Sequence, residues 1–292
     1  MNLHALRVFH TVARLASFSQ AADALFISQP AVSKALKELE HQLDMQLIER
    51  AAKGKKLTLT ASGNALYAHA RSIFAIEKAA IDDINARKGL KKGALLIGTS
   101  TTIANYWLPP YLAKFKQKYP DIKIEVQVAN TAQIEQALLD CTIDLALVEG
   151  SPHQTGIISR HWQQDKMSVV LSCDQQIGKN TQKWLNEQVW LLREPGSGTL
   201  EMSLKWLEKL KIQPQNVIQL GSNEAIAHAA AQGLGIALLP QVVCADLIAL
   251  GKLQSLVEFE HMDMARPLLQ LQFKDRPSSH AALAFEAVLY AE

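Results

Sequence analysis

The stretch SQPAVSKALKEL, residues 28–39, decides the fold of the N-terminal part of this chain. Its apolar side chains recur at helical spacing and define one face that a core can bury; they are Val32, Ala35, Leu36 and Leu39. Ser28 is suited to cap such a helix, and Pro30 is tolerated in its first turn. The stretch therefore predicts an amphipathic helix whose opposite face stays polar, with Gln29, Ser33, Lys34 and Lys37.

The polar face of this predicted helix has the side chains that read DNA bases. Glutamine can form paired hydrogen bonds with adenine, serine can donate or accept, and lysine can reach guanine edges or phosphates. A helix that enters a major groove makes such contacts near its N-terminus, where these residues lie. The alternative is an ordinary solvated helix face. The candidate DNA-binding residues of this helix are Ser28, Gln29, Pro30, Ser33, Lys34 and Lys37.

The preceding segment predicts two more helices. Apolar spacing indicates a helix at 3–15 and a shorter one at 20–25, for which Ser19 is a suitable N-cap. Phe26 and Ile27 then form the turn that leads into the helix at 28–39. Two helices this close together make a helix-turn-helix.

The following segment predicts a wing beside this motif. The residues LTL at 57–59 alternate like a short strand, and the basic tip KGKK at 53–56 comes just before them. A glycine in a tight turn, flanked by lysines, can place positive charge against the DNA backbone, which adds affinity but little sequence information. The candidate DNA contacts of this wing are Arg50, Lys53, Lys55, Lys56 and Thr58.

Together these motifs give the chain a clear resemblance to the LysR-type transcription regulators. The resemblance is carried by Leu6, Phe9, Val12, Ser17, Phe18, Ala21, Ala22, Leu25, Ser28 to Ser33, Leu36, Leu39, Glu40, Leu47, Arg50, Leu59, Thr60 and Gly63. The family usually has Gly and Phe where this chain has Asp44 and Ile48, so packing near the wing is expected to differ. The resemblance implies a regulator that binds double-stranded promoter DNA through residues 1–60, a winged helix-turn-helix domain.

Residues 61–92 predict a long linker helix and a hinge. Neither Pro nor Gly interrupts residues 64–88, and an apolar stripe runs through Leu66, Ala70, Ile73, Ala80, Ile81 and Ile84, with Glu77 interrupting it. About 25 residues at ~1.5 Å each make a rod of roughly 37 Å, long enough to pair with a second copy. The alternative is a helix that packs on its own chain. The resemblance implies a dimer through this helix and a homotetramer, and the basic run at 88–93 is interpreted as a hinge.

Residues 93–292 predict an α/β sensor domain. Strand-like runs at 94–98, 122–128, 143–148, 168–171, 189–192, 217–220 and 235–239 alternate with helical stretches. The resemblance implies the two-lobed fold of type 2 periplasmic binding proteins, with a ligand between the lobes. We expect lobe I at about 93–161 and 267–292, lobe II at about 162–266, and a last strand (267–274) and helix (278–290) that return to lobe I.

Polar residues follow several of these strands, where open α/β sheets bind ligands. Two of the runs lead into predicted helices, whose free N–H groups favour an anion. The clearest is GSGT at 196–199, for which the alternative is a simple helix N-cap. The candidate effector-binding residues are Ser100, Thr101, Thr102, Asn130, Thr131, Glu149, Arg193, Ser197, Gly198, Thr199 and Asn223.

The charges in this set leave two alternatives open. Arg193 could be the counter-charge of an anion or part of a surface ion pair. Glu149 could face a ligand that carries an ammonium or another donor, or could turn away into a structural salt bridge. Segments 98–110 and 193–199 resemble those of family members that sense sulfur oxyanions or organic acids. We therefore expect no cofactor but a small-molecule effector, an inorganic oxyanion or a small carboxylate.

Composition limits the other possibilities. The first thirty residues lack the apolar core of a signal peptide and no later window has the length of a membrane span, so we expect a cytoplasmic protein with no membrane partner. Residues 1–92 hold 14 basic and 8 acidic side chains, against 16 and 20 in the remainder, which fits a head that binds a polyanion. The three cysteines, Cys141, Cys173 and Cys244, are too dispersed for a disulfide framework or a metal site.

Two other functions would each fit part of the sequence. A solute-binding protein would explain residues 93–292 but would leave residues 1–60 without a purpose. A cytoplasmic α/β enzyme with an accessory helical domain would need a catalytic set, and the nine histidines form no HExxH motif or recognisable Ser, His and Asp set. The sequence thus favours a regulator and not an enzyme.

Overall fold

The computed structural model describes residues 2–49, 57–87, 94–178, 181–256, 259 and 264–291. The chain divides into two compact units. The first unit comprises Met1–Asp82 with Asp275–Pro277, and the second comprises Asp83–Lys274 with Ser278–Glu292. The predicted hinge at 88–93 lies outside the described residues. None of the described helices has the length and apolarity needed to cross a bilayer.

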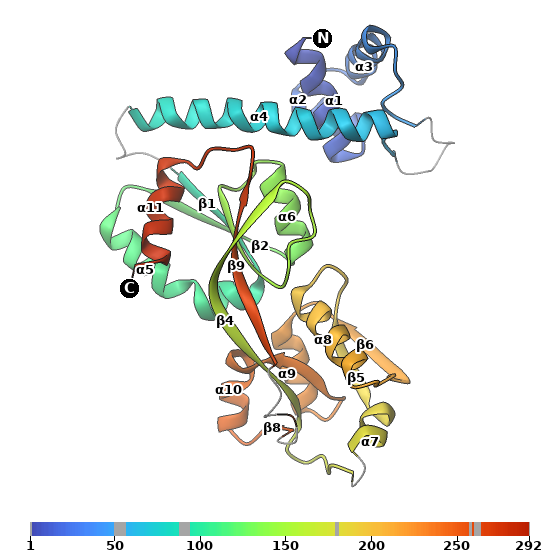
Figure 1. The fold of residues 1–292 in the computed structure, drawn as a ribbon, viewed down its shortest axis with the longest axis vertical. Coiled ribbons are helices and arrows are strands. Elements are labelled where there is room, and N and C mark those ends of the chain that lie inside the picture. Colours follow the sequence, from blue (N-terminus) through green and yellow to red (C-terminus); the bar gives the residue numbers. More distant parts are fainter. Residues whose placement is uncertain are drawn as a thin grey trace. The chain divides into compact units, whose positions relative to one another are not determined.

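The first unit is a helical head (Figure 1). Its helices are α1 (Leu3–Leu15), α2 (Phe18–Leu25), α3 (Gln29–Leu43) and the start of α4 (Ala61–Arg87). The prediction for α2 was wrong at its start, because Ser17 and not Ser19 caps it: the Ser17 side chain accepts a hydrogen bond from the Gln20 N–H. Ala16 takes a left-handed conformation (φ 47°), which turns the chain sharply enough for α2 to begin at Phe18.

The head is held together by one apolar core. The face of α3 predicted to be buried is confirmed, since Val32 and Leu39 are fully buried and Leu36 is 4% exposed. Other large members of this core are Leu6, Phe9, Val12, Leu47 and Phe74. The core therefore joins α1, α2 and α3 to the first part of α4.

Gly63 is required where α4 approaches the segment before the wing. A Cβ atom at this position would lie 2.0 Å from the carbonyl oxygen of Leu47, far inside van der Waals contact. The helix begins at Ala61, the first residue of the segment predicted to hold it.

The interpretation that the long helix packs on its own chain holds for part of its surface. Ala70 is fully buried and Phe74 is 9% exposed, and both belong to the core of the helical head, so this part of α4 packs on its own chain. Glu77, which interrupts the predicted stripe, pairs with Arg7 of α1 at 2.6 Å. An exposed apolar row remains, with Ile73, Ile76, Ile81 and Ile84 between 36% and 58% exposed. That row is available to a second copy of the helix.

The second unit is an α/β domain built around one continuous sheet. The strands of its path run in the order β2 (Lys123–Val128), β1 (Ala94–Thr99), β3 (Leu145–Glu149), β9 (Ala265–Phe273), β4 (Ile157–Ser172) and β7 (Ala237–Pro240). A short strand, β8 (Leu253–Ser255), also pairs with β4. A separate parallel pair, β5 (Val189–Arg193) and β6 (Asn216–Leu220), is joined to this sheet by a bridge between Trp190 and Ile236.

Two lobes form at the ends of this sheet. The first contains η1 (Ile103–Trp107), α5 (Pro109–Lys118), α6 (Thr131–Leu139) and α11 (His280–Leu289), and its core includes Leu95, Phe115 and Phe285. The second contains α7 (Thr181–Glu187), α8 (Gly198–Lys209), α9 (Asn223–Ala231) and α10 (Gln241–Ala249). Its strands carry apolar side chains on both faces, which pack in two clusters, one around Trp190 and one around Ile226.

Two long antiparallel strands, β4 and β9, cross from one lobe to the other (Figure 1). The sequence predicted a strand only at 168–171, yet β4 runs from Ile157 to Ser172. Its first half was missed because it is polar: SRHWQQDK at 159–166 lacks the apolar pattern of a buried strand. A bulge between His161 and Gln163 interrupts its pairing with β9. The connection between the two lobes is therefore a two-stranded ribbon of β4 and β9, the hinge ribbon, which is distinct from the predicted hinge at 88–93.

Candidate functional sites

The first candidate site is the exposed face of α3. Ser28 caps this helix by accepting a hydrogen bond from the Ala31 N–H at 3.4 Å. Gln29, Pro30, Lys34 and Lys37 are exposed, and Ser33 is half-buried. The only ion pair on this face within the described residues joins Lys34 to Glu38 at 3.8 Å, and both side chains are largely exposed. Such a pair contributes little, so the lysine remains available to another partner.

The base of the wing is an isolated bridge, shorter than the strand predicted at 57–59. Ile48 and Leu59 form an antiparallel bridge, the Glu49 N–H donates to the Thr58 carbonyl at 2.9 Å, and the Thr60 N–H donates to the Leu47 carbonyl at 3.0 Å. The Thr58 hydroxyl donates to the Glu49 carboxylate at 2.6 Å. The other candidate wing residues, Arg50, Lys53, Lys55 and Lys56, lie outside the described residues.

The two departures from the family pattern have a local explanation. Asp44 ends α3 with φ 50°, a left-handed conformation that glycine adopts freely and aspartate tolerates. Ile48 is 7% exposed and belongs to the core of the head. The Glu40 carboxylate accepts the Leu47 and Ile48 N–H groups at 2.8 and 3.3 Å, which ties the wing to α3.

The second candidate site lies in the α/β domain, where the starts of α8 and α9 meet the end of β1. The Asn223 amide nitrogen donates to the Thr102 hydroxyl at 2.8 Å and to the Thr199 hydroxyl at 3.1 Å. Thr102 belongs to the first lobe, and Asn223 and Thr199 belong to the second. The structure thus brings together three candidate effector residues from distant parts of the chain.

Backbone contacts reinforce this meeting of the lobes. A Cβ at Gly198 would lie 2.5 Å from the Glu149 carbonyl oxygen, so only glycine allows α8 to approach β3 this closely. The same carbonyl accepts the Thr131 hydroxyl at 3.2 Å. Asn130 caps α6 through a capping box with Gln133 and also donates to the Pro195 carbonyl at 3.4 Å.

Hydroxyl side chains cap the helical starts around this site. Ser197 caps α8 by accepting the Thr199 N–H at 3.2 Å, so the simpler alternative for the GSGT run holds for this serine. Ser100 similarly accepts the Ile103 N–H at 3.3 Å. The Thr101 hydroxyl is buried and has no hydrogen-bond partner in the described part of the chain.

Arg193 is paired with its neighbour. Its Nε and Nη2 atoms donate to the two carboxylate oxygens of Glu194 at 2.8 and 2.9 Å, and only 5% of the arginine is exposed. Burial alone would raise the pKa of Glu194, but hydrogen bonds, above all from Arg193, outweigh it and hold that pKa below its usual value. The arginine thus already has a counter-charge at this position.

The side chain of Glu149 forms a buried salt bridge with Arg266. Of the two alternatives for Glu149, a ligand contact or a structural salt bridge, the structure has the salt bridge. One of its oxygens lies 3.3 Å from Nη1 of Arg266, and the other is buried without a partner among the described residues. Arg266 also donates from Nε and Nη2 to Asp165 Oδ2 at 3.1 and 2.8 Å, and from Nη1 to the Thr199 hydroxyl at 2.9 Å. Arg266 is fully buried and Asp165 is 1% exposed.

Arg266 and Asp165 were missed by the sequence analysis. They are opposite each other on β9 and β4, the strands that cross between the lobes. Burial raises the pKa of Asp165, the adjacent Glu149 raises it further, and Arg266 opposes both effects. The available signal was a lone arginine at the start of the apolar run ARPLLQLQF, residues 265–273, but its partner is a hundred residues away in the chain.

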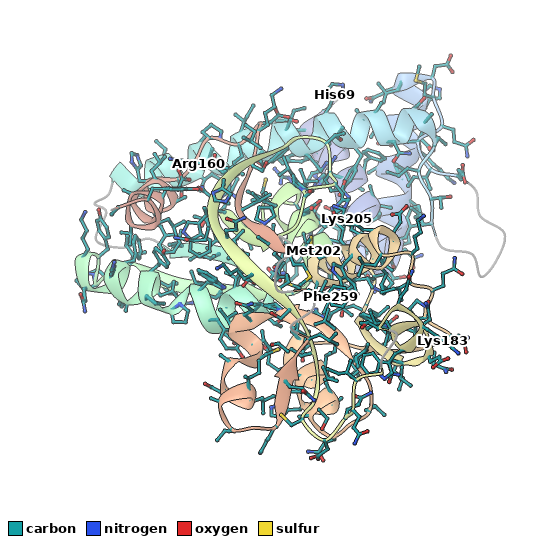
Figure 2. The ribbon with its side chains drawn as sticks, turned by 60° about the horizontal axis from the view of Figure 1, so that its bottom comes forward. His69, Arg160, Lys183, Met202, Lys205 and Phe259 are labelled. Carbon is teal, nitrogen blue, oxygen red and sulfur yellow. The ribbon has the colours of Figure 1, made fainter. Side chains whose placement is uncertain are left out.

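A further group of charges bridges the lobes at the start of α8. His153 lies 3.7 Å from the carboxylate of Glu135 on α6 and 3.7 Å from that of Glu201 on α8. Lys205, labelled in Figure 2, also projects from α8 and pairs with Glu201 at 2.5 Å. Within the described ranges, no group of three or more His, Cys, Asp or Glu is arranged to hold a metal ion.

None of the three described cysteines, Cys141, Cys173 and Cys244, forms a disulfide bond. Cys244 is fully buried. Burial, with a smaller effect of the Asp165 charge, raises the pKa of this thiol to about 12. A thiol with so high a pKa is a poor nucleophile at neutral pH.

A winged helix-turn-helix, a long helix and a two-lobed α/β domain together define a DNA-binding regulator with a ligand-sensing domain. Residues 3–64 match the family of bacterial regulatory helix-turn-helix proteins of the lysR type, and residues 88–292 match the LysR substrate binding domain. The chain belongs to the LysR family of transcription regulators. It is a DNA-binding regulator with an effector-binding domain, and neither the enzyme nor the solute-binding alternative is favoured.

Individual relatives agree with this assignment. The uncharacterized HTH-type transcriptional regulator YeiE of Escherichia coli K12 is 35% identical over 98% of this chain and 96% of its own length. The CcmR regulatory domain of Synechocystis in complex with 2-PG is 25% identical, with a TM-score of 0.60 over 68% of this chain and 96% of that one. Full-length CbnR complexed with its target DNA has a TM-score of 0.58 over 99% of both chains, and its 21% identity supports the fold alone.

Proposed function

We propose that this regulator reads a two-fold promoter site through α3 and the wing, and that a small anionic effector in the α/β domain changes how it holds the DNA. The observation that carries the proposal is the division of α3 into two faces. One face is buried in the core of the head, and the other presents Gln29, Lys34 and Lys37 to solvent at the helix start. This is the arrangement of a helix that enters a major groove.

The DNA contacts are assigned by chemistry. Gln29 and Ser33 are suited to base edges, whereas Lys34 and Lys37 can reach guanine or phosphate. Ser28 and Pro30 place the first turn of α3 against the DNA, and the wing residues Arg50, Lys53, Lys55, Lys56 and Thr58 contact its backbone. The match of residues 3–64 to the family of bacterial regulatory helix-turn-helix proteins of the lysR type supports this use of the head.

The test of this assignment is promoter footprinting combined with affinity measurement at several salt concentrations. Gln29→Ala should weaken specific binding by about 1–3 kcal/mol and relax the preference at one base pair. Lys34→Ala should weaken binding and reduce the salt dependence. Lys118→Ala, a change in the last turn of α5, is the control. Unchanged operator affinity and preference in the combined Gln29→Ala, Lys34→Ala variant would contradict the proposal.

The division of labour along the chain is part of the same proposal. Residues 1–60 form the DNA-binding domain, residues 61–92 the dimerisation helix and hinge, and residues 93–292 the effector-binding domain. The exposed isoleucine row of α4 supports pairing between two copies, which would place two α3 helices on a two-fold site. Dimers then assemble into a tetramer, and the protein acts in the cytoplasm, where promoters are.

The effector is assigned to the meeting point of the lobes. Its binding set comprises Ser100, Thr101, Thr102, Asn130, Thr131, Ser197, Gly198, Thr199 and Asn223, with Glu149 and Arg193 taking part through their ion pairs. The start of α8 supplies N–H groups and hydroxyls suited to an inorganic oxyanion or a small carboxylate. The CcmR regulatory domain in complex with 2-PG supports a small-molecule ligand in this domain.

Calorimetric titration with sulfate, phosphate and small carboxylates tests the effector class. Ser100→Ala and Thr199→Ala should each weaken binding of an anion that the unmodified protein binds. If both variants bind the anion as tightly as the unmodified protein, the effector site does not lie at this position. The matched control is Ser279→Ala, which alters the N-cap of α11 and none of the candidate residues.

Coupling between effector and DNA requires that the effector bind one arrangement of the lobes better than another. We propose that the β4 and β9 ribbon allows the lobes to close on the ligand and that closure changes the packing of dimers in the tetramer. The effector should then alter the length or the bend of the protected DNA more than the base contacts of α3. Identical footprints and bend angles with and without a bound effector would contradict this coupling.

A further inference from the structure

We infer that Arg266 is a positioning residue of the effector site: it holds the Thr199 hydroxyl as a hydrogen-bond donor, so that the site selects ligands that present an acceptor oxygen. The inference rests on the proposed function, because it concerns the same site. Arg266 lies on β9 of the hinge ribbon and not in one of the polar runs at strand ends that supplied the other candidate residues. The inference assigns it a definite effect on which ligands the site binds.

The guanidinium of Arg266 is fixed from one side by Asp165. Both residues are almost wholly buried, and they face each other in the register of β4 and β9. Two of the three guanidinium nitrogens donate to the same oxygen, Asp165 Oδ2, at 3.1 and 2.8 Å. Because the guanidinium is planar, this double contact also fixes the direction of the third nitrogen, Nη1.

The third nitrogen is directed at the Thr199 hydroxyl. Nη1 donates to Thr199 Oγ1 at 2.9 Å, and the Asn223 amide nitrogen donates to the same oxygen at 3.1 Å. A hydroxyl oxygen has two acceptor positions and one proton. With both positions occupied, the threonine proton must be donated in another direction. Thr199 lies in the first turn of α8, so this proton adds to the N–H groups of the helix start.

Charge supports the same conclusion. Without Arg266, the buried carboxylates of Glu149 and Asp165 would lie beside the start of α8 with no counter-charge and would repel an anion. Arg266 contacts both, at 3.3 Å to Glu149 Oε1 and 2.8 Å to Asp165 Oδ2. Burial raises the pKa of Asp165, with a further contribution from Glu149, so this group takes up a proton more readily than an ordinary aspartate.

The experiment is a double-mutant cycle on the full-length protein. Sulfate, phosphate, acetate and succinate are titrated calorimetrically, with methylammonium as a probe that can only donate. The variants are Thr199→Val, Arg266→Lys and their combination. Thr199→Val removes the hydroxyl at nearly constant volume, and Arg266→Lys keeps the charge but loses the planar contact with Asp165.

We expect each single variant to bind the anion about tenfold more weakly, which corresponds to about 1.4 kcal/mol. If Arg266 acts through Thr199, the combined variant should bind within about twofold of Thr199→Val alone. Additive losses, about a hundredfold in the combined variant, would overturn the inference, since they would mean that Arg266 acts independently of the hydroxyl. Tighter binding of methylammonium than of every anion would also overturn it.

Two failures can be told apart. If the unmodified protein binds no anion, the anionic effector of the proposed function fails and the inference fails with it. If the unmodified protein and Arg266→Lys bind an anion equally well, only the inference fails. Should Arg266→Lys not fold, as judged by circular dichroism and thermal unfolding, the pair Asp165→Asn, Arg266→Met replaces it in the cycle. That variant removes both charges together, which avoids an unpaired buried carboxylate.

Discussion

The two candidate sites are built in opposite ways. The DNA-reading face lies on a single helix, its residues fall within ten positions of one another, and most are exposed. The effector site draws Thr102, Thr199, Asn223 and Arg266 from widely separated segments, and each is almost fully buried. Local sequence determines the first site, whereas tertiary packing determines the second. Changes in the two regions should therefore differ in how they act, and four predictions test this difference.

The largest effect is expected in the helical head. Gly63→Ala would place a Cβ 2.0 Å from the Leu47 carbonyl oxygen, which forces α4 away from the base of the wing. We expect a loss of more than about 3 kcal/mol in the free energy of unfolding of the head, measured by urea denaturation. Gly221→Ala in the α/β domain, where nothing lies within 4 Å of the added atom, is the control and should be nearly neutral.

The next effect separates buried from exposed ion pairs. Asp165→Ala leaves Arg266 without its main partner in a buried position and should lower the free energy of unfolding of the α/β domain by about 3 kcal/mol. Glu77→Ala removes the Arg7 ion pair of the head, whose side chains are 41% and 46% exposed, and should cost no more than about 1 kcal/mol. Equal losses in the two variants would mean that burial does not distinguish the regions.

A smaller effect is expected on the stability of the helical head at acidic pH, through His10. His10 packs against the rings of Tyr67 and Phe74, at centroid distances of 5.3 and 5.2 Å. Burial lowers its pKa from 6.5 to about 4, with added effects of the positive charges of Arg14, Arg71 and Arg7. Between these two pKa values the unfolded chain binds a proton that the folded head does not, so the stability present above pH 6.5 is lost as the pH falls towards 4.

We expect this histidine to cost the head about 2 kcal/mol of stability between pH 7 and pH 4. Chemical denaturation over this pH range measures it. His10→Phe keeps the ring contacts and should flatten the pH dependence by that amount. His161→Phe, on the hinge strand β4 of the other unit, is the matched control and should leave the pH dependence of the head unchanged. A pH profile that is the same with and without His10 would refute the assignment.

The smallest effect is expected at a helix cap. Asn130→Ala removes the capping box of α6 and the hydrogen bond to Pro195, and should cost about 1 kcal/mol in thermal or chemical unfolding of the α/β domain. Gln133→Ala removes only the reciprocal hydrogen bond of the same box, so it should cost less. A larger loss from Gln133→Ala than from Asn130→Ala would contradict this ranking.

The elements of the head could be predicted because their signals are local. The apolar spacing of α3 and the cap at Ser28 both lie within a few residues of the structure that they determine. The error at the start of α2 is of the same kind: Ser17 and Ser19 are both good caps, and the choice between them depends on the left-handed Ala16, which the sequence does not reveal.

The effector site could be predicted only in part. Hydroxyls and glycines at strand ends indicated its general position, because parallel strands end at a common edge. The salt bridge of Glu149 and the place of Arg266 in the site both depend on the pairing of Asp165 with Arg266 across β4 and β9. No local sequence pattern encodes the register between residues a hundred positions apart. The first half of β4 escaped notice for a related reason, since a polar ribbon between lobes lacks the alternation of a half-buried strand.

The ribbon has one more consequence, for the ancestry and engineering of such chains. The backbone enters the second lobe once, along β4, and leaves it once, along β9, and the Met167 N–H still donates to the Met264 carbonyl at 2.9 Å where the two strands meet. The second lobe is thus one continuous segment of the chain, between Met167 and Met264, and its two ends lie side by side. A recombination event with two crossovers could exchange that segment between related genes and supply half of a new ligand specificity, leaving the DNA-reading part and the other lobe intact.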